Sequence, residues 1–273
     1  MPDPVHIAHR RIWRDNGGFS AGDRAIPEET AIALSYDGGT YAVMMGTPTD
    51  LEDFAVGFSL SEGIIDARDD ITSLEVVELD DGIDVRMWLE TSRATRLGER
   101  RRHIAGPTGC GLCGIDSIAE AVRPAAVVGH GIRVSPPQIM AAMQALAPLQ
   151  KLNMETRAVH AAAFWHPDRG IVALREDVGR HNALDKLAGT IARQSLAAIE
   201  GIVLLTSRVS VEMVQKSAAL GTSMIVSVSA PTALAVRMAE AANITLCAIA
   251  RADGFEVFTH SHRVSTGVSI DVA

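Results

Sequence analysis

The first third of the chain alternates short apolar runs with tight Asp-Gly turns. Four runs bracket two such turns: residues 30–36 and 40–45 around Asp37-Gly38-Gly39, and residues 74–79 and 83–89 around Asp80-Asp81-Gly82. Apolar runs joined in this way are typical of β-hairpins. Between them, Thr49 and Glu52 have capping-box spacing, which predicts a helix towards residue 64. The stretch from residue 91 to 109 is polar and contains Gly106-Pro107, so it reads as a loop.

The second half has a different rhythm, in which short apolar strands alternate with helical periodicity. The expected strands cover residues 158–165, 171–175, 202–205, 224–228 and 244–250, and the expected helices cover 135–146 and 181–199 and begin again at Ser210 and Pro231. Such alternation indicates crossover connections and a largely parallel, buried sheet. The sequence therefore predicts an α/β fold, with a smaller β-rich α+β domain over residues 1–125 and an α/β domain over residues 126–273.

Composition narrows the class of protein. The chain has 273 residues, 47% of them apolar, which is enough to bury a core without disulfides. Its formal charge of −8 disfavours a broad grip on nucleic acid. No apolar run reaches the length of a membrane span, and the first residues lack the apolar stretch of a leader peptide. We therefore expect a cytoplasmic protein without nucleic-acid or membrane partners.

The sharpest local signal is the glycine-rich segment from Gly106 to Gly114, which contains Cys110 and Cys113. Four glycines and a proline in nine residues predict an irregular, exposed loop, so both thiols should be reachable. Apolar residues at helical spacing follow, which places the cysteines near a helix amino terminus. The dipole and free N–H groups there favour thiolate over thiol. A thiolate can accept a sulfane sulfur, and a second thiol nearby can resolve or shield the persulfide.

Other interpretations of the same loop remain. A structural zinc site needs four ligands, and Cys-x-x-Cys supplies two, so distant histidines would have to complete it. A thioredoxin-like redox motif would follow a core strand, and the basic residues 100–103 are not strand-like. The match of Gly109, Gly111 and Gly114 to a dinucleotide fingerprint lacks the preceding strand. A glycine-rich turn with two unrelated cysteines is the plainest alternative.

Polar clusters follow three successive strands of the second half. They are residues 175–186, Thr206-Ser207-Arg208 and Ser227-Val228-Ser229-Ala230. Because ligand sites gather at the carboxyl ends of parallel strands, these hydroxyls, N–H groups and arginines together indicate an anionic ligand. Lys216 is a candidate phosphate contact, although a solvent-facing helix lysine is more common. His160, on an apolar strand, is interpreted as a core histidine.

These segments together resemble the formate dehydrogenase accessory sulfurtransferases, the FdhD family. The matching blocks follow one another in unbroken order from about residue 25: residues 108–114, 160–163, 176–186, 207–208, 212–218, 228–236, 243–246 and 258–260. The resemblance implies a carboxy-terminal domain similar to the three-layer cytidine-deaminase fold and a homodimer. It also implies that a cysteine desulfurase supplies sulfur as a persulfide. The sulfur would pass to the molybdenum or tungsten bis-guanine-dinucleotide pterin cofactor, a bound cargo destined for the catalytic subunit of formate dehydrogenase.

Residue roles follow from the resemblance by position. Cys110 and Cys113 would carry the sulfur, with Cys110 preferred as first acceptor, and no resident metal is expected. The ligand-contacting segment would be Ile249, Ala250, Arg251, Ala252, Asp253 and Gly254. The phosphates or guanine would be bound by Thr206, Ser207, Arg208, Ser229, His181 and Lys216. Arg157-Ala158 stands where the family usually has Gly-Gly. Deaminase chemistry is not expected, because the His-x-Glu and Pro-Cys-x-x-Cys order is missing.

Two other functions compete with sulfur transfer. One is a non-catalytic chaperone that binds the cofactor and formate dehydrogenase without moving sulfur. The other is a zinc-binding interaction module built on the cysteine pair. Uptake of cyanide-labile sulfur distinguishes the first from a sulfur carrier, and tightly held zinc would identify the second.

Overall fold

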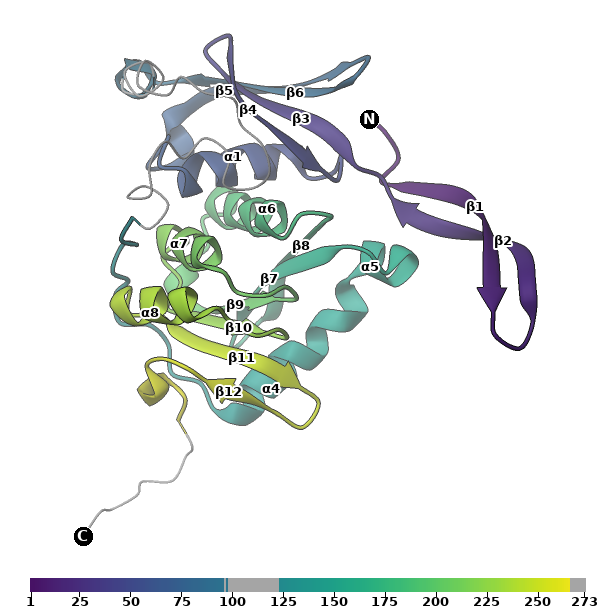
Figure 1. Cartoon of the computed structure of the whole chain (residues 1–273). Coiled ribbons are helices and arrows are strands. Elements are labelled where there is room, and N and C mark those ends of the chain that lie inside the picture. Colours follow the sequence, from purple (N-terminus) through teal and green to yellow (C-terminus); the bar gives the residue numbers. More distant parts are fainter. Residues whose placement is uncertain (96, 98–122, 266–273) are drawn as a thin grey trace.

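A computed structural model describes residues 1–95, 97 and 123–265 of the chain (Figure 1). Within them the strands form a two-stranded, a four-stranded and a six-stranded sheet. The sheets come in chain order, so the β-rich part precedes the α/β part as the sequence predicts. The boundary between two domains at residues 125 and 126 stays a prediction.

The four-stranded sheet has the order β4-β3-β6-β5 and is covered on one face by helix α1. Its elements are β3 (Thr30–Tyr36), β4 (Gly39–Gly46), α1 (Leu51–Ser61), β5 (Ile71–Leu79) and β6 (Gly82–Leu89). Alternate residues of β3, namely Ile32, Leu34 and Tyr36, are fully buried under α1. Both predicted hairpins and the helix are confirmed.

Two details of this region differ from the prediction. The capping box is wrong, because α1 begins after Asp50, which has left-handed backbone and makes no side-chain cap hydrogen bond. Residues 91–95 are helical rather than loop. Thr91 opens that turn with its carbonyl accepting a hydrogen bond from the Thr95 hydroxyl at 2.9 Å. A polar composition alone does not separate a short exposed helix from a loop.

The two-stranded sheet is a hairpin that projects from the body of the molecule (Figure 1). Strands β1 (Val5–Arg14) and β2 (Gly18–Pro27) pair antiparallel over their whole length. The sequence pattern gave no sign of it, because most residues on both faces are exposed and no apolar alternation marks a buried side. We call residues 5–27 the arm.

The six-stranded sheet has the order β12-β11-β10-β9-β7-β8. Its strands are β7 (His160–His166), β8 (Gly170–Asp177), β9 (Ile202–Leu205), β10 (Met224–Ser227), β11 (Thr245–Arg251) and β12 (Gly254–Val257). Only the pairings of β9 with β10 and of β10 with β11 are parallel. The prediction of a largely parallel sheet is therefore wrong for this part of the chain: β7–β8 and β11–β12 are tight hairpins, and β7 pairs antiparallel with β9.

Helices cover both faces of this sheet (Figure 1). On the face towards the four-stranded sheet lie α6 (Arg180–Arg193), α7 (Val211–Leu220) and α8 (Ala233–Ala241); α4 (Pro136–Leu146) packs on the other face and leads through residues 147–149 to α5 (Lys151–Thr156). Three layers are thus present, and the specific likeness to a cytidine deaminase stays a prediction. The helix expected to reach residue 199 ends at Arg193, because Ser195 takes left-handed backbone (φ 52°).

The two halves meet where α1 crosses α6. A Cβ atom on Gly57 would lie 1.7 Å from the carbonyl oxygen of Asp185, and one on Gly189 would lie 1.8 Å from that of Asp53. The two helix backbones therefore touch at a point where only glycine fits. We call this contact surface, with the side chains around it, the seam. None of the helices in the described residues is long and apolar enough to cross a membrane.

Candidate functional site

The charged segment 175–186 was predicted to bind a ligand, but half of it holds the seam together. Lys186 and Asp177 are fully buried and form an ion pair of 2.6 Å. The Lys186 ammonium also donates to the carbonyl of Thr47, at 2.9 Å, and the Thr47 amide donates to Asp177, at 3.0 Å. Asn182 donates to Asp177 and to the carbonyl of Met45. These polar groups fix α6 to the loop that precedes α1.

A second set of buried charges lies farther along the seam. Asp53 of α1 accepts from Arg175 at 2.6 Å, from Arg193 at 2.6 Å and from the Thr190 hydroxyl at 3.0 Å. All three partners of this carboxylate come from the six-stranded half. Because unpaired charge is costly to bury, this arrangement commits these side chains to structure rather than to a ligand.

Lys216 belongs to the seam as well. Its ammonium lies 2.9 Å from both carboxylate oxygens of Asp185 and 2.8 Å from the Ser61 hydroxyl, with the ring of Phe58 beside it. The pKa of Lys216 lies above its ordinary value: burial lowers it, but the Asp185 and Glu62 carboxylates outweigh that effect. The lysine is neither solvent-facing nor free, and its charge is already compensated within the protein.

The ends of β9, β10 and β11 converge at one edge of the sheet, as expected for parallel neighbours. The Ser227 hydroxyl donates to the carbonyl of Ser207 at 2.6 Å, and the Ile249 amide donates to the carbonyl of Ser229 at 3.2 Å. The Arg251 guanidinium donates to the carbonyl of Val228. Three segments that lie far apart in the sequence thus meet here; we call this edge, with the adjacent start of α6, the strand-end site.

The predicted hydroxyls of this site are mostly occupied. Thr206 accepts from the Ala161 amide at 2.8 Å, which ties β9 to β7, and the buried Ser207 hydroxyl donates to the carbonyl of Arg208 at 3.2 Å. The Arg208 side chain is exposed, and its guanidinium makes no hydrogen bond or ion pair within the described residues. Among the predicted contacts after β9, Arg208 is therefore the side chain that remains free to bind an anion.

The start of α6 contributes buried polar atoms that have no partner among residues 1–95, 97 and 123–265. They are Nε of Arg180 and Nε2 of His181. His181 is 4.0 Å from the Glu212 carboxylate, yet its pKa is lowered to about 4, first by burial and then by the charges of Arg180 and Lys216. The imidazole is therefore neutral at physiological pH and can accept or donate one hydrogen bond on its free nitrogen.

Sequence reasoning singled out His181 but passed over Arg180 and His160 as site residues. Arg180 directly follows Gly179 and is the first residue of α6, a position whose neighbouring N–H groups favour anions. Its place at the start of a predicted helix was the sequence signal that could have identified Arg180 as a candidate anion contact. His160 begins β7 and is half-buried; burial lowers its pKa, and the charge of Arg180 lowers it further. The two histidines and Arg180 thus form one electrostatic group.

The segment expected to contact the ligand, residues 249–254, contains a backbone irregularity. Ile249 has left-handed backbone (φ 53°), and the β11–β12 pairing shifts register between Ala248 and Arg251. A β-branched residue in this conformation is strained, and such strain gathers at functional sites. Ala250 is buried, whereas Ala252 and Asp253 form the exposed turn before Gly254.

Cys110 and Cys113, predicted to carry the sulfur, lie outside the described residues. The chain on either side of them is placed: Leu97 packs into the core beneath α1, and Arg123 donates to the carbonyl of Ser61 at 3.3 Å. The Arg123 carbonyl accepts from Gln215 of α7 at 2.9 Å. Within the described part of the chain, no three His, Cys, Asp or Glu side chains gather as a metal site.

Comparison with known proteins assigns the class to which this fold and site belong. Residues 27–265 match the model of the FdhD/NarQ family, and the chain belongs to that family. It is 52% identical to the sulfur carrier protein FdhD of Agrobacterium fabrum, over 95% of this chain and 97% of that one. It is 51% identical to the protein of the same name from Brucella abortus, over 96% of each.

A solved structure supports the fold. The crystal structure of a protein assigned as a formate dehydrogenase accessory protein, from Desulfotalea psychrophila, matches with a TM-score of 0.74. The match covers 96% of this chain and all of that one, at 23% sequence identity. At that identity the match establishes the arrangement of the helices and strands, and it does not establish a chemical function.

Proposed function

We propose that this protein is a cytoplasmic sulfur carrier in the maturation of formate dehydrogenase. It takes sulfur from a cysteine desulfurase as a persulfide and delivers it to a molybdenum or tungsten bis-guanine-dinucleotide pterin. The observation that carries the proposal is the 52% identity, over nearly the whole chain, with a relative named as a sulfur carrier. The partners would be the desulfurase, the catalytic subunit of formate dehydrogenase and a second copy of this chain.

The sulfur would be held on Cys110 or Cys113. In the loading step, a cysteine thiolate attacks the outer sulfur of the donor's persulfide, a new S–S bond forms, and the donor cysteine leaves as a thiolate. No net oxidant is needed, because one persulfide is exchanged for another. The third cysteine, Cys247, is buried in β11, and burial raises the pKa of its thiol to about 12. It is therefore inert at neutral pH and serves as an internal control.

The strand-end site would bind the nucleotide part of the substrate. Its free groups are the Arg208 guanidinium, the Arg180 Nε and the His181 Nε2. Arg251, at the end of β11, belongs to the same edge and donates to the carbonyl of Val228. Phosphates need cationic and N–H donors, and a guanine edge needs a donor and an acceptor. The chain as a whole has a net charge of −8 and should repel anions, whereas the strand-end site carries arginines. This local positive charge supports specific binding of an anionic substrate.

The test measures sulfur loading on the wild type and on variants in which one cysteine at a time is replaced by alanine. After incubation with a cysteine desulfurase and cysteine, the wild-type protein should gain cyanide-labile sulfur and about 32 Da per sulfur atom, reversible by reductant. Cys110→Ala and Cys113→Ala should each reduce the signal at least about fivefold, whereas the matched variant Cys247→Ala should keep it because that thiol is not ionised.

Three outcomes would decide against the proposal. A wild-type protein that is folded and takes up no sulfur would support the cofactor-binding chaperone. Full loading in both loop variants would remove the role of the cysteine pair. Stoichiometric zinc that disappears with Cys110→Ala or Cys113→Ala would support a zinc-binding interaction module.

A further inference from the structure

The arm is held only at its root. Near the body, the Arg24 guanidinium donates to the carbonyl of Thr156 at the end of α5, at 3.3 Å. Towards the tip the strands contact only each other, and no arm residue belongs to an apolar cluster of the described chain (Figure 1). An isolated two-stranded hairpin is at best marginally stable in water. The tip therefore needs a surface to pack against.

One face of the arm carries unpartnered apolar side chains. The strand register places Trp13 opposite Phe19, and Ile7 opposite Ala25, on the same face as Arg11. Trp13 is 58% exposed, Phe19 65% and Ile7 53%. The Arg11 guanidinium lies over the Phe19 ring, 4.8 Å from its centroid. The tip thus presents two large aromatic rings with a cation beside them, a composition typical of interface hot spots.

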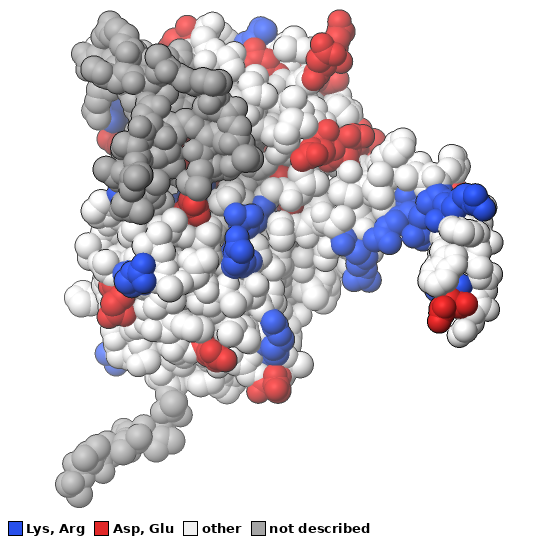
Figure 2. Space-filling view, viewed as in Figure 1, with Lys and Arg blue, Asp and Glu red and all other residues white. Residues whose placement is uncertain are grey.

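The charge of the arm is opposite to that of the rest of the chain. Residues 5–27 contain four arginines and two aspartates, which gives 4 − 2 = +2. The chain total of −8 then leaves −10 for all other residues. Figure 2 shows the basic side chains along the arm and acidic ones on the upper part of the body. An acidic partner surface is therefore favoured.

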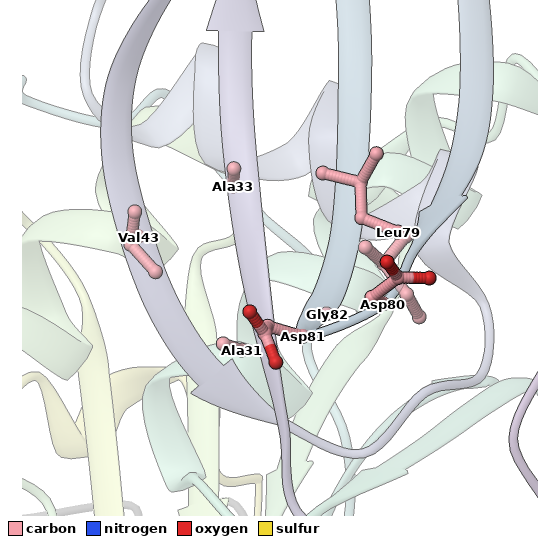
Figure 3. Close-up of a pocket in the computed structure, with 8 residues that line it drawn as sticks. Ala31, Ala33, Val43, Leu79, Asp80, Asp81 and Gly82 are labelled. Carbon is pink, nitrogen blue, oxygen red and sulfur yellow. The ribbon is translucent and has the colours of Figure 1, made fainter.

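The same chain carries such a surface on the outer face of the four-stranded sheet (Figure 3). A shallow depression of about 410 Å³ has a floor of small residues, including Ala31 and Ala33. Val43 and Leu79 stand beside the floor and are 58% and 53% exposed. Asp80 and Asp81 line it as well and lie exposed at the turn before Gly82. We call this depression the sheet groove.

We propose that the arm of one copy of this protein docks into the sheet groove of a second copy. Trp13 and Phe19 would cover Val43, Leu79 and the alanine floor. Arg11, which shares that face of the arm, would face Asp80 and Asp81. Arg14, beside the hairpin turn on the other face, would add positive charge near them. Apolar surface on both sides leaves water together, and the charges that flank it are of opposite sign.

Geometry favours a second copy over the arm's own groove. A ten-residue strand is about 30 Å long at ~3.4 Å per residue, so the tip stays that far from the root at any hinge angle. The groove begins at Ala31, four residues beyond the root residue Pro27. The arm's own tip would overshoot it. Two copies, each with one arm and one groove, can exchange arms and close as a symmetric pair.

The test is the oligomeric state of charge-reversed variants, measured by sedimentation equilibrium on the full chain. The wild type should dimerise. The arm variant Arg11→Glu/Arg14→Glu and the groove variant Asp80→Lys/Asp81→Lys should each raise the dimer Kd at least about tenfold. The fourfold variant that combines both reversals should recover most of the affinity. Arg237→Glu, an exposed arginine of α8, is the matched control and should have no effect.

A cross-link identifies the contact. A benzoylphenylalanine at position 19 should attach to peptides spanning residues 31–45 or 79–83 of the second copy, told apart by isotope labelling. A wild-type monomer at 100 µM, a dimer indifferent to the arm variant, or an arm effect without a groove effect would each overturn the proposal. Circular dichroism confirms that every variant is folded. This contact rests on the second copy named in the proposed function and specifies how it is held; its failure would leave the sulfur-loading result unchanged.

Discussion

The seam and the strand-end site share the twelve-residue segment 175–186 and differ in how its polar groups are used. On the seam side of segment 175–186, Asp177 and Lys186 are fully buried and paired with each other. On the strand-end side, Arg180 and His181 are also largely buried, but each keeps a nitrogen without a partner in the described chain. One segment thus carries both satisfied and unsatisfied polar groups.

This difference separates structure from binding more clearly than residue type does. A buried polar group without a hydrogen-bond partner lowers the stability of the folded protein, because it has lost its hydrogen bonds to water. The satisfied groups of the seam need no ligand. The groups at the start of α6 that lack a hydrogen-bond partner in the described chain are the ones that the proposed function assigns to ligand binding.

Breaking the seam should have the largest effect on stability. Lys186→Met leaves the Asp177 carboxylate buried without its cation, which should lower the free energy of unfolding by about 3–5 kcal/mol. Lys216→Met should cost somewhat less, since the Lys216 side chain is 11% exposed, whereas that of Lys186 is fully buried. Urea denaturation measures both.

The chain offers a matched control for these substitutions. Lys151→Met changes the one remaining lysine, which is exposed at the start of α5, and should shift stability by no more than about 0.5 kcal/mol. If Lys216→Met were as mild as this control while abolishing substrate binding, Lys216 would belong to the site and not to the seam.

The buried imidazole of the strand-end site should make the stability of the protein depend on pH. The pKa of His181 is about 4 in the folded protein, below its ordinary value of 6.5, so the unfolded chain binds more protons between these limits. Stability should therefore fall as the pH drops below about 6.5. From pH 7.5 to 5 this group should account for a loss of about 2 kcal/mol. The loss should be absent in His181→Gln, as seen by urea denaturation at each pH. An unchanged slope in that variant would mean that the imidazole is not desolvated.

The smallest effect on stability, within about 0.5 kcal/mol, is expected at the free arginine of the site. Arg208→Ala removes no contact that holds the fold, yet it should weaken binding of guanosine diphosphate roughly tenfold or more, because a charge-assisted hydrogen bond to phosphate is lost. Arg237→Ala should bind normally in the same calorimetric titration. Equal binding by both variants would place the nucleotide elsewhere.

The sequence was informative where a local pattern decides the structure. Asp37-Gly38-Gly39 and Asp80-Asp81-Gly82 were enough to locate two hairpins, and Ser135 with two prolines located the start of α4. The convergence of Thr206 and Ser229 at one edge followed from the alternation of strands and helices. These features depend on neighbours in sequence, which a single chain displays.

The rest depends on contacts between distant residues. Lys216 pairs with Asp185, 31 residues away, and Ser61, 155 residues away, so nothing near it in sequence announces a buried ion pair. The glycines of the seam, Gly57 and Gly189, look like ordinary helix residues until the two helices are brought together. The arm was not predicted, because neither of its faces packs on a core and its sequence therefore lacks the alternation of apolar and polar residues typical of a strand.

The departure at Arg157 also becomes intelligible. Arg157 ends α5 with left-handed backbone (φ 58°, ψ 29°), a conformation in which glycine is at ease and other residues pay about 1 kcal/mol or more. The backbone shape expected of a glycine is therefore kept here by an arginine.

The scarcity and placement of lysine have a practical corollary. The chain has only three lysines, and two of them are locked in the seam by carboxylates. Amine-directed dyes, biotin esters and coupling resins will therefore attach to the native protein at Lys151 and the terminal amine. Attachment at Lys151, on the short helix α5, leaves the two buried lysines and their ion pairs intact.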